Sequence, residues 1–323
     1  MIRKIRRACY YIRHNRAQFC DSLVANLLFW LPDEPYLRLR FRFKMGYWPN
    51  LTTPHTFVEK INWLKLHDRK PEYTMMVDKY AVKEYVASKI GGEYIIPTLG
   101  VWKEPEDIDF DALPNQFVLK TTHGGGSGGV VVVVCKDKNT LDKGKAIMRL
   151  RDSMDSDIYR NLREWPYKNV KKRVIAEKFM MPKEKVNDPT YDLTDYKFFC
   201  FGGEPCYCQV IRDRHTRESI DFYDMEWNHQ SFVGLNPKAP DGTPAIANGI
   251  TPVGKPKRIE TMKEICRTLS ANIPFLRVDL YVIDGKVYFG ELTFYPASGI
   301  GFFKPKEWDE KLGNLIDIND KIL

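Results

Sequence analysis

The chain has 323 residues, of which 43% are hydrophobic and 13% aromatic, so it can bury a sizeable core in one large domain or in two. This composition excludes an intrinsically disordered chain, and the lack of any run of about 18 apolar residues excludes a membrane-spanning helix. The net charge of +8 suits anionic partners such as nucleotides, acidic glycans, nucleic acids or lipid surfaces, without choosing among them.

The first 50 residues carry many arginines, lysines and aromatic side chains. Two interpretations remain open, a solvated basic face on helices or contact with a membrane surface or an anionic polymer. Residues 19–31 form a mostly apolar run after this basic start, but Asp21 and Asn26 interrupt it and no small-residue cleavage site follows. We interpret the run as a buried helix rather than a signal peptide.

Apolar residues at helical spacing and short β-branched or alternating runs predict the elements beyond residue 50. The predicted helices span residues 56–66, 79–89, 141–151 and 259–269. The predicted strands span residues 94–101, 117–120, 130–135, 174–180, 195–201, 206–212 and 222–227, followed by a hairpin of 278–283 and 287–294. The first half therefore mixes helices and strands, and the second half consists mainly of strands.

Seven cysteines are spread along the chain without the spacing of a disulfide framework. This odd number favours reduced thiols and a cytosolic location. The Cys206-x-Cys208 pair has no matching Cys or His pair that would complete a tetrahedral zinc site. We therefore expect a cytoplasmic protein without a structural zinc.

A glycine-rich segment at residues 124–129 lies between a strand that ends at Lys120 and a run of five valines. Its G-x-G-x-x-G spacing matches the dinucleotide fingerprint, but that fingerprint requires a helix directly afterwards, and a valine run forms a strand. No Gly-Lys-Ser/Thr, His-Arg-Asp or Asp-Phe-Gly occurs, which excludes a Walker loop and a protein kinase. The remaining interpretation is a hairpin whose backbone N–H groups close over a triphosphate beside Lys120; a hairpin tip without a ligand is the alternative.

The last predicted hairpin allows a test of side-chain register. A two-residue turn would mix its apolar and polar faces. A three-residue loop at residues 284–286 with a bulge instead places Asp279 opposite Glu291 and Arg277 opposite Thr293, and keeps one face apolar. We prefer the second register because it separates the two faces.

Two carboxylates, Asp279 and Glu291, then converge on one face of the hairpin. Like charges at such a distance are unfavourable without a cation, and Mg²⁺ that carries substrate phosphates would relieve the repulsion. The alternative is an ion pair of Arg277 with either carboxylate on a solvated face.

The order of these motifs resembles the ATP-grasp superfamily: a lysine before a glycine hairpin, a strand ending in Glu177-Lys178-Phe179, and Arg-x-Asp followed by Glu-x-Thr-x-x-Pro. More narrowly, the chain resembles the TupA-like branch, which is associated with teichuronopeptide and surface-polysaccharide biosynthesis. The resemblance covers roughly residues 55–305 and rests on residues 60–65 (KINWLK), 78–83 (DKYAVK), 195–201 (DYKFFCF), 277–281 (RVDLY) and 290–296 (GELTFYP).

This resemblance implies a nucleotide site that holds ATP. The residues implied to contact its phosphates are Lys79, Lys120, Lys197 and the loop residues Gly125, Gly126, Ser127 and Gly128. Glu177, with the backbone at Lys178 and Phe179, would hold adenine at a hinge between two subdomains. Glu184 would take the ribose hydroxyls.

The resemblance also implies a Mg²⁺ site and a catalytic set. Asp279 and Glu291 would bind the metal, and Thr293, where many relatives have Asn, would be a third ligand that coordinates weakly or through water. The catalytic residues would be Lys120, Lys197 and Arg277.

The implied architecture is an α+β ATP-grasp fold, in which two subdomains with antiparallel sheets clasp ATP. We expect a basic helical region at residues 1–70 and an ATP-grasp domain at 71–323, with subdomains of about 71–175 and 176–323.

The expected activity is that of an ADP-forming carboxylate–amine ligase that works through an acyl phosphate and joins an amine or amino acid to a sugar acid in surface-polysaccharide biosynthesis. Arg212 and Arg214 follow a strand and could clamp the carboxylate substrate, although a solvated basic loop is an equal alternative. A phosphotransferase acting on a glycan hydroxyl and a non-catalytic nucleotide-binding scaffold are the other interpretations. We expect a cytoplasmic protein, peripheral to the inner face of the membrane through its basic N-terminal arm, and no nucleic-acid partner.

Overall fold

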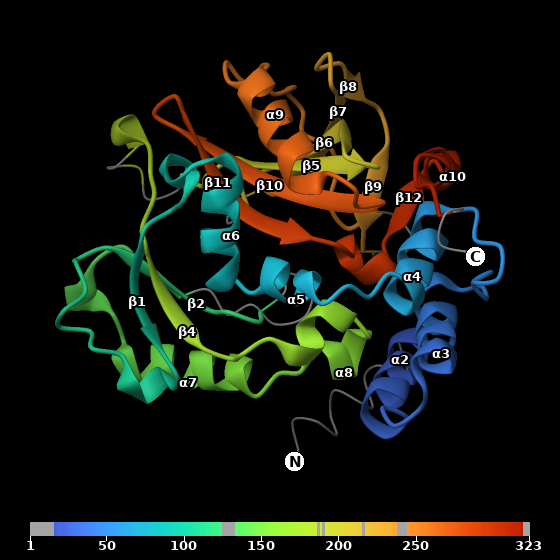
Figure 1. Cartoon of the computed structure of the whole chain (residues 1–323), viewed down its shortest axis with the longest axis horizontal. Coiled ribbons are helices and arrows are strands. Elements are labelled where there is room, and N and C mark those ends of the chain that lie inside the picture. The colour runs from blue at the N-terminus through green and yellow to red at the C-terminus, as the bar shows by residue number, and fades with distance from the viewer. Residues whose placement is uncertain are drawn as a thin grey trace.

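The computed structural model describes residues 16–124, 133–185, 188, 191–214, 217–237 and 244–318. Figure 1 shows two separate β-sheets, the smaller at the lower left and the larger above it, with α5 and α6 between them. Both sheets are antiparallel throughout. The predicted α+β fold with two antiparallel sheets is therefore confirmed.

The smaller sheet has the strand order β1-β4-β2-β3. Its strands are β1 (Thr98–Trp102), β2 (Phe117–Thr121), β3 (Val133–Cys135) and β4 (Val174–Lys178). Alternate residues of β2 are fully buried against α7 (Lys143–Met154), because Phe117 and Leu119 pack in one apolar cluster with Leu150. Lys120 lies at an alternate position and is left on the other face, toward the cavity described below.

The larger sheet has the strand order β11-β10-β5-β6-β7-β8. Its strands are β5 (Asp195–Phe201), β6 (Glu204–Arg212), β7 (Ser219–Asp224), β8 (His229–Gln230), β10 (Phe275–Ile283) and β11 (Lys286–Thr293). Aromatic side chains fill its core, where Phe57 of α4 packs edge-on against Phe275 with the ring centroids 5.0 Å apart. A helix of the expected N-terminal region thus shares a core with this sheet.

The remaining elements surround the two sheets (Figure 1). The α-helices are α2 (Arg16–Leu27), α3 (Asp33–Met45), α4 (Phe57–His67), α5 (Glu72–Val77), α6 (Ala81–Ile90), α8 (Ile158–Leu162), α9 (Ile259–Ser270) and α10 (Glu307–Asn314). The 3₁₀ segments are η1 (Gly92–Tyr94), η2 (Pro105–Asp107), η3 (Lys138–Thr140), η4 (Trp165–Asn169), η5 (Lys183–Lys185) and η6 (Pro296–Gly299), and the strands β9 (Val233–Asn236) and β12 (Phe302–Lys304) form a separate pair.

The hairpin of β10 and β11 has the predicted pairing at its two carboxylates, but a different backbone feature produces it. Asp279 lies opposite Glu291 and Arg277 opposite Thr293, as predicted. The turn itself is the two-residue turn that we rejected, because Ile283 pairs directly with Lys286, and the extra residue is inserted at Gly290 instead. A side chain at position 290 would place its Cβ 2.9 Å from the Tyr281 ring and 3.0 Å from the Asp279 carbonyl oxygen, so glycine fits the close approach at the bulge.

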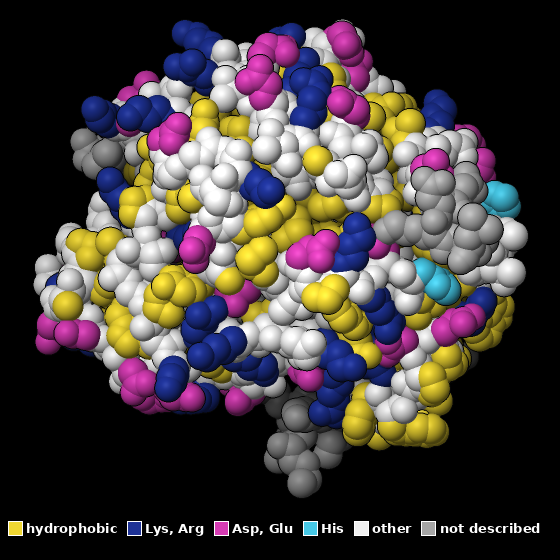
Figure 2. Space-filling view, viewed as in Figure 1, with side chains coloured by type: hydrophobic (Ala, Val, Ile, Leu, Met, Phe, Trp, Pro, Cys, Tyr) yellow, Lys and Arg dark blue, Asp and Glu magenta, His cyan; other side chains and the backbone are white. Residues whose placement is uncertain are grey.

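The prediction of a buried helix at residues 19–31 is wrong. The helix α2 ends at Leu27, and Leu23, Leu27, Phe29 and Trp30 are exposed, with Trp30 at 67% of its full accessibility. Figure 2 shows hydrophobic side chains gathered at the lower right, the region of α2 and α3 in Figure 1. The helix α2 is therefore amphipathic: the side that carries Val24 is buried, and the opposite side faces solvent.

Among the described residues, no helix has both the length and the apolar character required to span a bilayer.

The strand predicted at residues 222–227 begins earlier and ends at Asp224, because Asp224 and Trp227 close a turn through the Trp227 N–H and the Asp224 carbonyl. The aromatic residues that suggested a longer strand belong partly to this turn.

Candidate functional site

A cavity of about 1020 Å³ lies between the two sheets. Its walls come from β2 and β4 of the smaller sheet, from β5, β6, β10 and β11 of the larger sheet, and from α2 and α8. Residues far apart in the sequence meet there, among them Lys79, Lys120, Lys197 and Glu291. Both sheets therefore contribute charged side chains to one enclosed space.

On the smaller sheet, one buried carboxylate holds two lysines. Glu177 on β4 forms ion pairs of 2.6 Å with both Lys83 and Lys120. Burial alone would raise the pKa of Glu177, but the two ammonium groups outweigh it and lower this pKa to about 2. Burial lowers the pKa of Lys83, although Glu177 opposes that change. This cluster carries one surplus positive charge at neutral pH.

On the larger sheet, Arg277 connects the polar residues of the carboxylate hairpin. Its guanidinium donates to Asp279 at 2.7 and 2.8 Å, to Glu291 at 3.1 Å and to the Thr293 hydroxyl at 2.9 Å. Lys197 joins them because β5 pairs with β10 so that Lys197 lies opposite Asp279, and the two side chains form an ion pair. The structure thus brings together all the residues expected to bind metal.

The electrostatics of the two hairpin carboxylates differ. Burial raises the pKa of Asp279, although Arg277 and Lys197 oppose the change. Partial burial would also raise the pKa of Glu291, but Lys79, Lys197 and Arg277 outweigh it and lower this pKa. Lys79 contacts Glu291 at 2.9 Å from the loop before α6. The surrounding cations therefore favour the charged form of Glu291.

The donor set of the hairpin fits Mg²⁺ in its chemistry. Magnesium is usually bound through one or two carboxylates together with substrate phosphates, and Asp279, Glu291 and Thr293 offer oxygens on one face. Within the described part of the chain, no group of three or more His, Cys, Asp or Glu side chains is arranged to hold a metal by itself. The hairpin oxygens are bonded to Arg277, Lys197 and Lys79, so a metal would share the site with these cations.

A comparison with known protein families matches residues 59–317 to the family described as TupA-like ATPgrasp. This match covers more than half of the chain. The chain belongs to the TupA-like ATP-grasp family. The resemblance identified from the motifs is thereby confirmed, and the matched segment contains every residue named above for the site.

Solved structures of several ligases are similar to this TupA-like protein at low identity. The D-alanine–D-alanine ligase from Bacillus anthracis, complexed with ATP, is 18% identical over 75% of this chain and 63% of that enzyme, with a TM-score of 0.40. The D-alanine–D-alanine ligase from Helicobacter pylori is 16% identical over 82% and 71% of the two chains, with a TM-score of 0.41. Phosphoribosylamine–glycine ligase from Thermotoga maritima is 16% identical over 69% and 48%, with a TM-score of 0.37.

The TupA-like chain spans less than two thirds of the length of the Bacillus anthracis enzyme. All three TM-scores are below 0.5, so the assignment to the family rests on the family match. A search of curated proteins found no match.

Several expected site residues lie elsewhere in this TupA-like protein. Lys178, Phe179 and Glu184 are not among the described residues that line the cavity, and the Lys178 backbone N–H donates to the Pro97 carbonyl at 3.0 Å. Glu184 is exposed in η5. The loop residues Gly125, Gly126, Ser127 and Gly128 and the N-terminal arm at residues 1–15 lie outside the described residues.

The two arginines expected to clamp a carboxylate also separate. Arg214 lines the cavity and bonds Asp195 at 2.5 Å. Arg212 instead bonds Asp221 at 3.0 Å and the Thr251 carbonyl at 2.8 Å, and it is not among the described lining residues. Of the expected pair, Arg214 is the one that reaches the cavity.

Sequence reasoning missed five charged residues of the cavity, namely Asp21, Arg40, Lys83, Glu164 and Asp195. Lys83 was detectable, since it follows Lys79 by one helical turn within the 78–83 motif. Asp195 begins β5 and contacts Lys197 at 2.9 Å, two residues away on the same face of the strand. Glu164 lies in a segment without a recognisable pattern, and nothing in the sequence pointed to it.

Proposed function

We propose that the protein is a Mg-ATP-dependent carboxylate–amine ligase that forms an amide through an acyl phosphate and releases ADP and phosphate. The main supporting observation is that a single cavity holds both the lysines expected to bind phosphates, such as Lys120 on the smaller sheet, and the carboxylate hairpin of the larger sheet. Membership of the TupA-like ATP-grasp family supports the same conclusion.

In this proposal, the cationic side chains bind the triphosphate. The described residues of this region provide six cations against four carboxylates. The cations are Lys79, Lys83, Lys120, Lys197, Arg214 and Arg277, and the carboxylates are Glu177, Asp195, Asp279 and Glu291. The excess positive charge is opposite in sign to nucleotide phosphates. Residues 125–128 would close over the phosphates, Glu177 with the backbone at 178–179 would hold adenine, and Glu184 the ribose.

Asp279, Glu291 and Thr293 would hold Mg²⁺, which neutralises phosphate charge when bound. Arg277 and Lys197 lie against the same oxygens and are positioned to shift onto the transferred phosphoryl group. Because phosphoryl transfer depends mainly on positioning and charge neutralisation, the site requires no nucleophilic side chain.

The reaction then has two steps. A carboxylate oxygen of the substrate attacks the γ-phosphorus, the bond from that phosphorus to the β–γ bridging oxygen breaks, and ADP leaves. The nitrogen of the amine next attacks the acyl carbon, the C–O bond to phosphate breaks, and the amide forms. Arg214, which lines the cavity, is positioned to bind the substrate carboxylate beside Lys197.

Nucleotide products and trapping test this proposal. With ATP, Mg²⁺ and a panel of uronic acids, we expect ADP and phosphate, and hydroxylamine should convert the acyl phosphate into a hydroxamate. An acid labelled with oxygen-18 in its carboxylate should transfer one label to phosphate. A stable phosphate ester would instead support a phosphotransferase, AMP and pyrophosphate would indicate adenylation, and no turnover with any acid would leave a nucleotide-binding scaffold.

The substrate we propose is a sugar acid of surface-polysaccharide biosynthesis, on the basis of the family resemblance. A cytoplasmic location is supported by the six described cysteines, which are all free thiols.

We also propose contact of residues 1–15 with anionic lipid at the inner face of the membrane. Deletion of these residues should leave ADP formation unchanged and weaken co-sedimentation with anionic vesicles in low salt, and equal sedimentation would refute this contact.

A further inference from the structure

The cavity continues beyond the hairpin cluster toward α2 and α8. Glu164, which follows α8, interacts electrostatically with Glu291 and Arg277 of the hairpin. The carbonyl of Asn161, at the end of α8, accepts hydrogen bonds from Tyr36 and Arg40 of α3. Arg40 in turn bonds Asp21 of α2. This end of the cavity is therefore built by α2, α3 and α8.

Glu164 is the acidic group of this part of the cavity. Its side chain lines the cavity and is 7% exposed. The nearest buried cation, Lys65, uses its three N–H groups on the Leu162 carbonyl and on both oxygens of Ser298, at 2.8–2.9 Å. Ser298 is the hydrogen-bond partner of Glu164. The carboxylate therefore keeps acceptor capacity for a cation that enters the cavity.

A second polar group at this end is the Tyr295 hydroxyl. It is buried and makes no hydrogen bond within the described part of the structure, although Tyr295 lines the cavity. Asp68 and Glu164 are among the charges that act on it. Unpaired buried hydroxyls are uncommon in folded proteins, so this group keeps unused hydrogen-bonding capacity.

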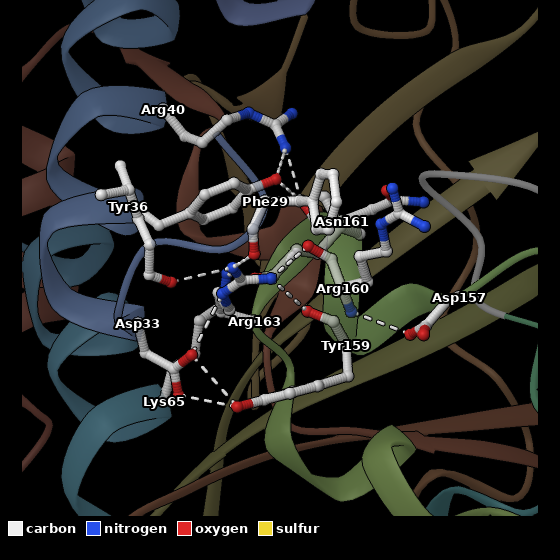
Figure 3. Close-up of polar contacts among 12 residues, drawn as sticks. Phe29, Asp33, Tyr36, Arg40, Lys65, Asp157, Tyr159, Arg160, Asn161 and Arg163 are labelled. Carbon is white, nitrogen blue, oxygen red and sulfur yellow. Dashed lines mark hydrogen bonds and ion pairs between the residues drawn. The ribbon is translucent and has the colours of Figure 1, made fainter. Parts of the chain in front are cut away.

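The segment that carries Glu164 is held rigidly by Arg163 (Figure 3). Arg163 has a left-handed backbone with φ 54° at the end of α8, and its guanidinium forms an ion pair of 3.0 Å with Asp33. It also donates to the Leu31 carbonyl at 3.2 Å and lies 3.9 Å from the centre of the Tyr36 ring. These contacts fix the direction in which the next residue, Glu164, projects.

The outer wall of this end comes from α2. Ser22, Ala25 and Asn26 line the cavity at positions i, i+3 and i+4, which is one face of a helix. They precede residue 59, where the family match begins. The wall thus belongs to the part of the chain outside the matched segment, as expected for an element that sets substrate choice.

We propose that this end of the cavity binds the amine substrate, with Glu164 holding its ammonium group and α2 enclosing the rest of the molecule. The inference rests on the proposed ligase function. Glu164 takes one proton from the ammonium, and the free amine attacks the acyl carbon. The second proton lost from nitrogen leaves with the phosphate as the C–O bond breaks, so one amide, one hydrogen phosphate and one protonated Glu164 result.

The electrostatic setting suits this role. Burial raises the pKa of Glu164, while Lys65 and Arg277 oppose the change and Glu291 adds to it. A base works best when its pKa lies nearer to neutral pH than that of an ordinary carboxylate. The raised pKa therefore favours proton transfer to Glu164, once the amine is bound.

The test separates acyl transfer to an ammonium-derived amine from transfer to hydroxylamine, which is uncharged at neutral pH. In Glu164→Gln, we expect hydroxamate formation within about twofold of wild type, and amide formation with a panel of amino acids and amino sugars about 100-fold lower, as expected for loss of a base. The acid limb of the pH profile for amide formation should also shift to the higher pKa of the amine itself, because the variant can use only amine that is already deprotonated. Glu260→Gln, on the exposed side of α9, is the matched control.

A second variant tests the wall without touching Glu164. Ala25→Leu should raise the KM for the amine about tenfold and leave the KM for ATP unchanged. Wild-type amide formation in Glu164→Gln would overturn the inference, because Glu164 would then have no role in the reaction. An equal loss of hydroxamate and amide would overturn it too, because Glu164 would then act only on the structure of the protein. If wild-type protein yields no hydroxamate with any acid, the ligase proposal itself fails and this inference fails with it.

Discussion

The two sheets present ion pairs to the same cavity, but they distribute charge differently. On the smaller sheet, Glu177 is shared by Lys83 and Lys120, so a positive charge is left over. On the hairpin of the larger sheet, the cations Arg277, Lys197 and Lys79 contact the carboxylates Asp279 and Glu291, so a positive charge is left over there too, but Arg277 is bonded to both carboxylates. Each lysine of the first cluster contacts one carboxylate, whereas Arg277 must release two before it is free to bind an anion.

This difference assigns separate tasks to the two clusters. The smaller-sheet cluster should determine nucleotide affinity, because an anion can add to it without displacing Glu177. The hairpin cluster should determine turnover, because its cations become useful when charge develops on the transferred phosphoryl group. Substitutions in the two clusters should therefore affect different constants.

The largest effect is expected from Asp279→Asn. The change leaves Arg277 and Lys197 short of a buried counter-charge, so turnover should fall about 10³-fold and the free energy of unfolding by about 3 kcal/mol. Steady-state ADP release and denaturant unfolding measure the two effects. Asp152→Asn on the exposed side of α7 is the matched control, and wild-type turnover in Asp279→Asn would contradict the separation of tasks.

Glu177 should contribute strongly to the pH dependence of stability at the acidic end. Its pKa falls from an ordinary 4.5 to about 2 in the fold, so its stabilising effect is complete above pH 4.5 and is lost as the pH falls toward 2. The loss amounts to about 3 kcal/mol. Unfolding of wild type and Glu177→Gln between pH 2.5 and 6 measures it, and parallel curves for the two proteins would disprove the strong pairing.

Replacement of Lys120 by alanine should weaken nucleotide binding about 10- to 100-fold, the usual worth of a charge-assisted hydrogen bond, with a smaller change in turnover at saturating ATP. Calorimetric titration with ATP and Mg²⁺ tests this expectation. Lys145→Ala, on the exposed side of α7, should bind like wild type. A variant at position 120 that binds normally but turns over slowly would reverse the assignment of the two clusters.

The smallest effect is expected from Thr293→Val. Its hydroxyl accepts one bond from Arg277, so its loss should cost about 1 kcal/mol and reduce turnover less than tenfold. The Mg²⁺ dependence of turnover sharpens the comparison. A tenfold rise in the Mg²⁺ requirement would identify Thr293 as a metal ligand, whereas an unchanged requirement would limit it to the positioning of Arg277.

The sequence predicted best those parts of the fold that depend on local pattern. The bounds of β5 agree with the prediction because a mostly aromatic run lies between turn signals, and all seven residues are buried, including the charged Asp195 and Lys197. The bounds of α9 differ by one residue at its end for a similar reason. The segment after α8 carries no such pattern, so Glu164 became visible only when tertiary contacts placed it in the cavity.

The failures have a physical explanation as well. The apolar run in α2 fits a buried helix in composition, but its exposure depends on which neighbours pack against it, and sequence periodicity does not contain that information. The residues at the expected adenine hinge were identified by motif alone and their role stays a prediction; the structure shows the Lys178 N–H bonded to the Pro97 carbonyl. Contacts between distant segments decide the exposure of α2.

The inserted residue at Gly290 acts as a frameshift in the side-chain alternation of β11. From the turn up to Phe289 the two strands are in one frame, and beyond the bulge they are in another. If Gly290 paired with Asp279 in the first frame instead of bulging out, Val278 rather than Asp279 would oppose Glu291, and the carboxylates would separate onto opposite faces of the sheet. A single residue without a side chain thus decides whether this hairpin can present both carboxylates on one face.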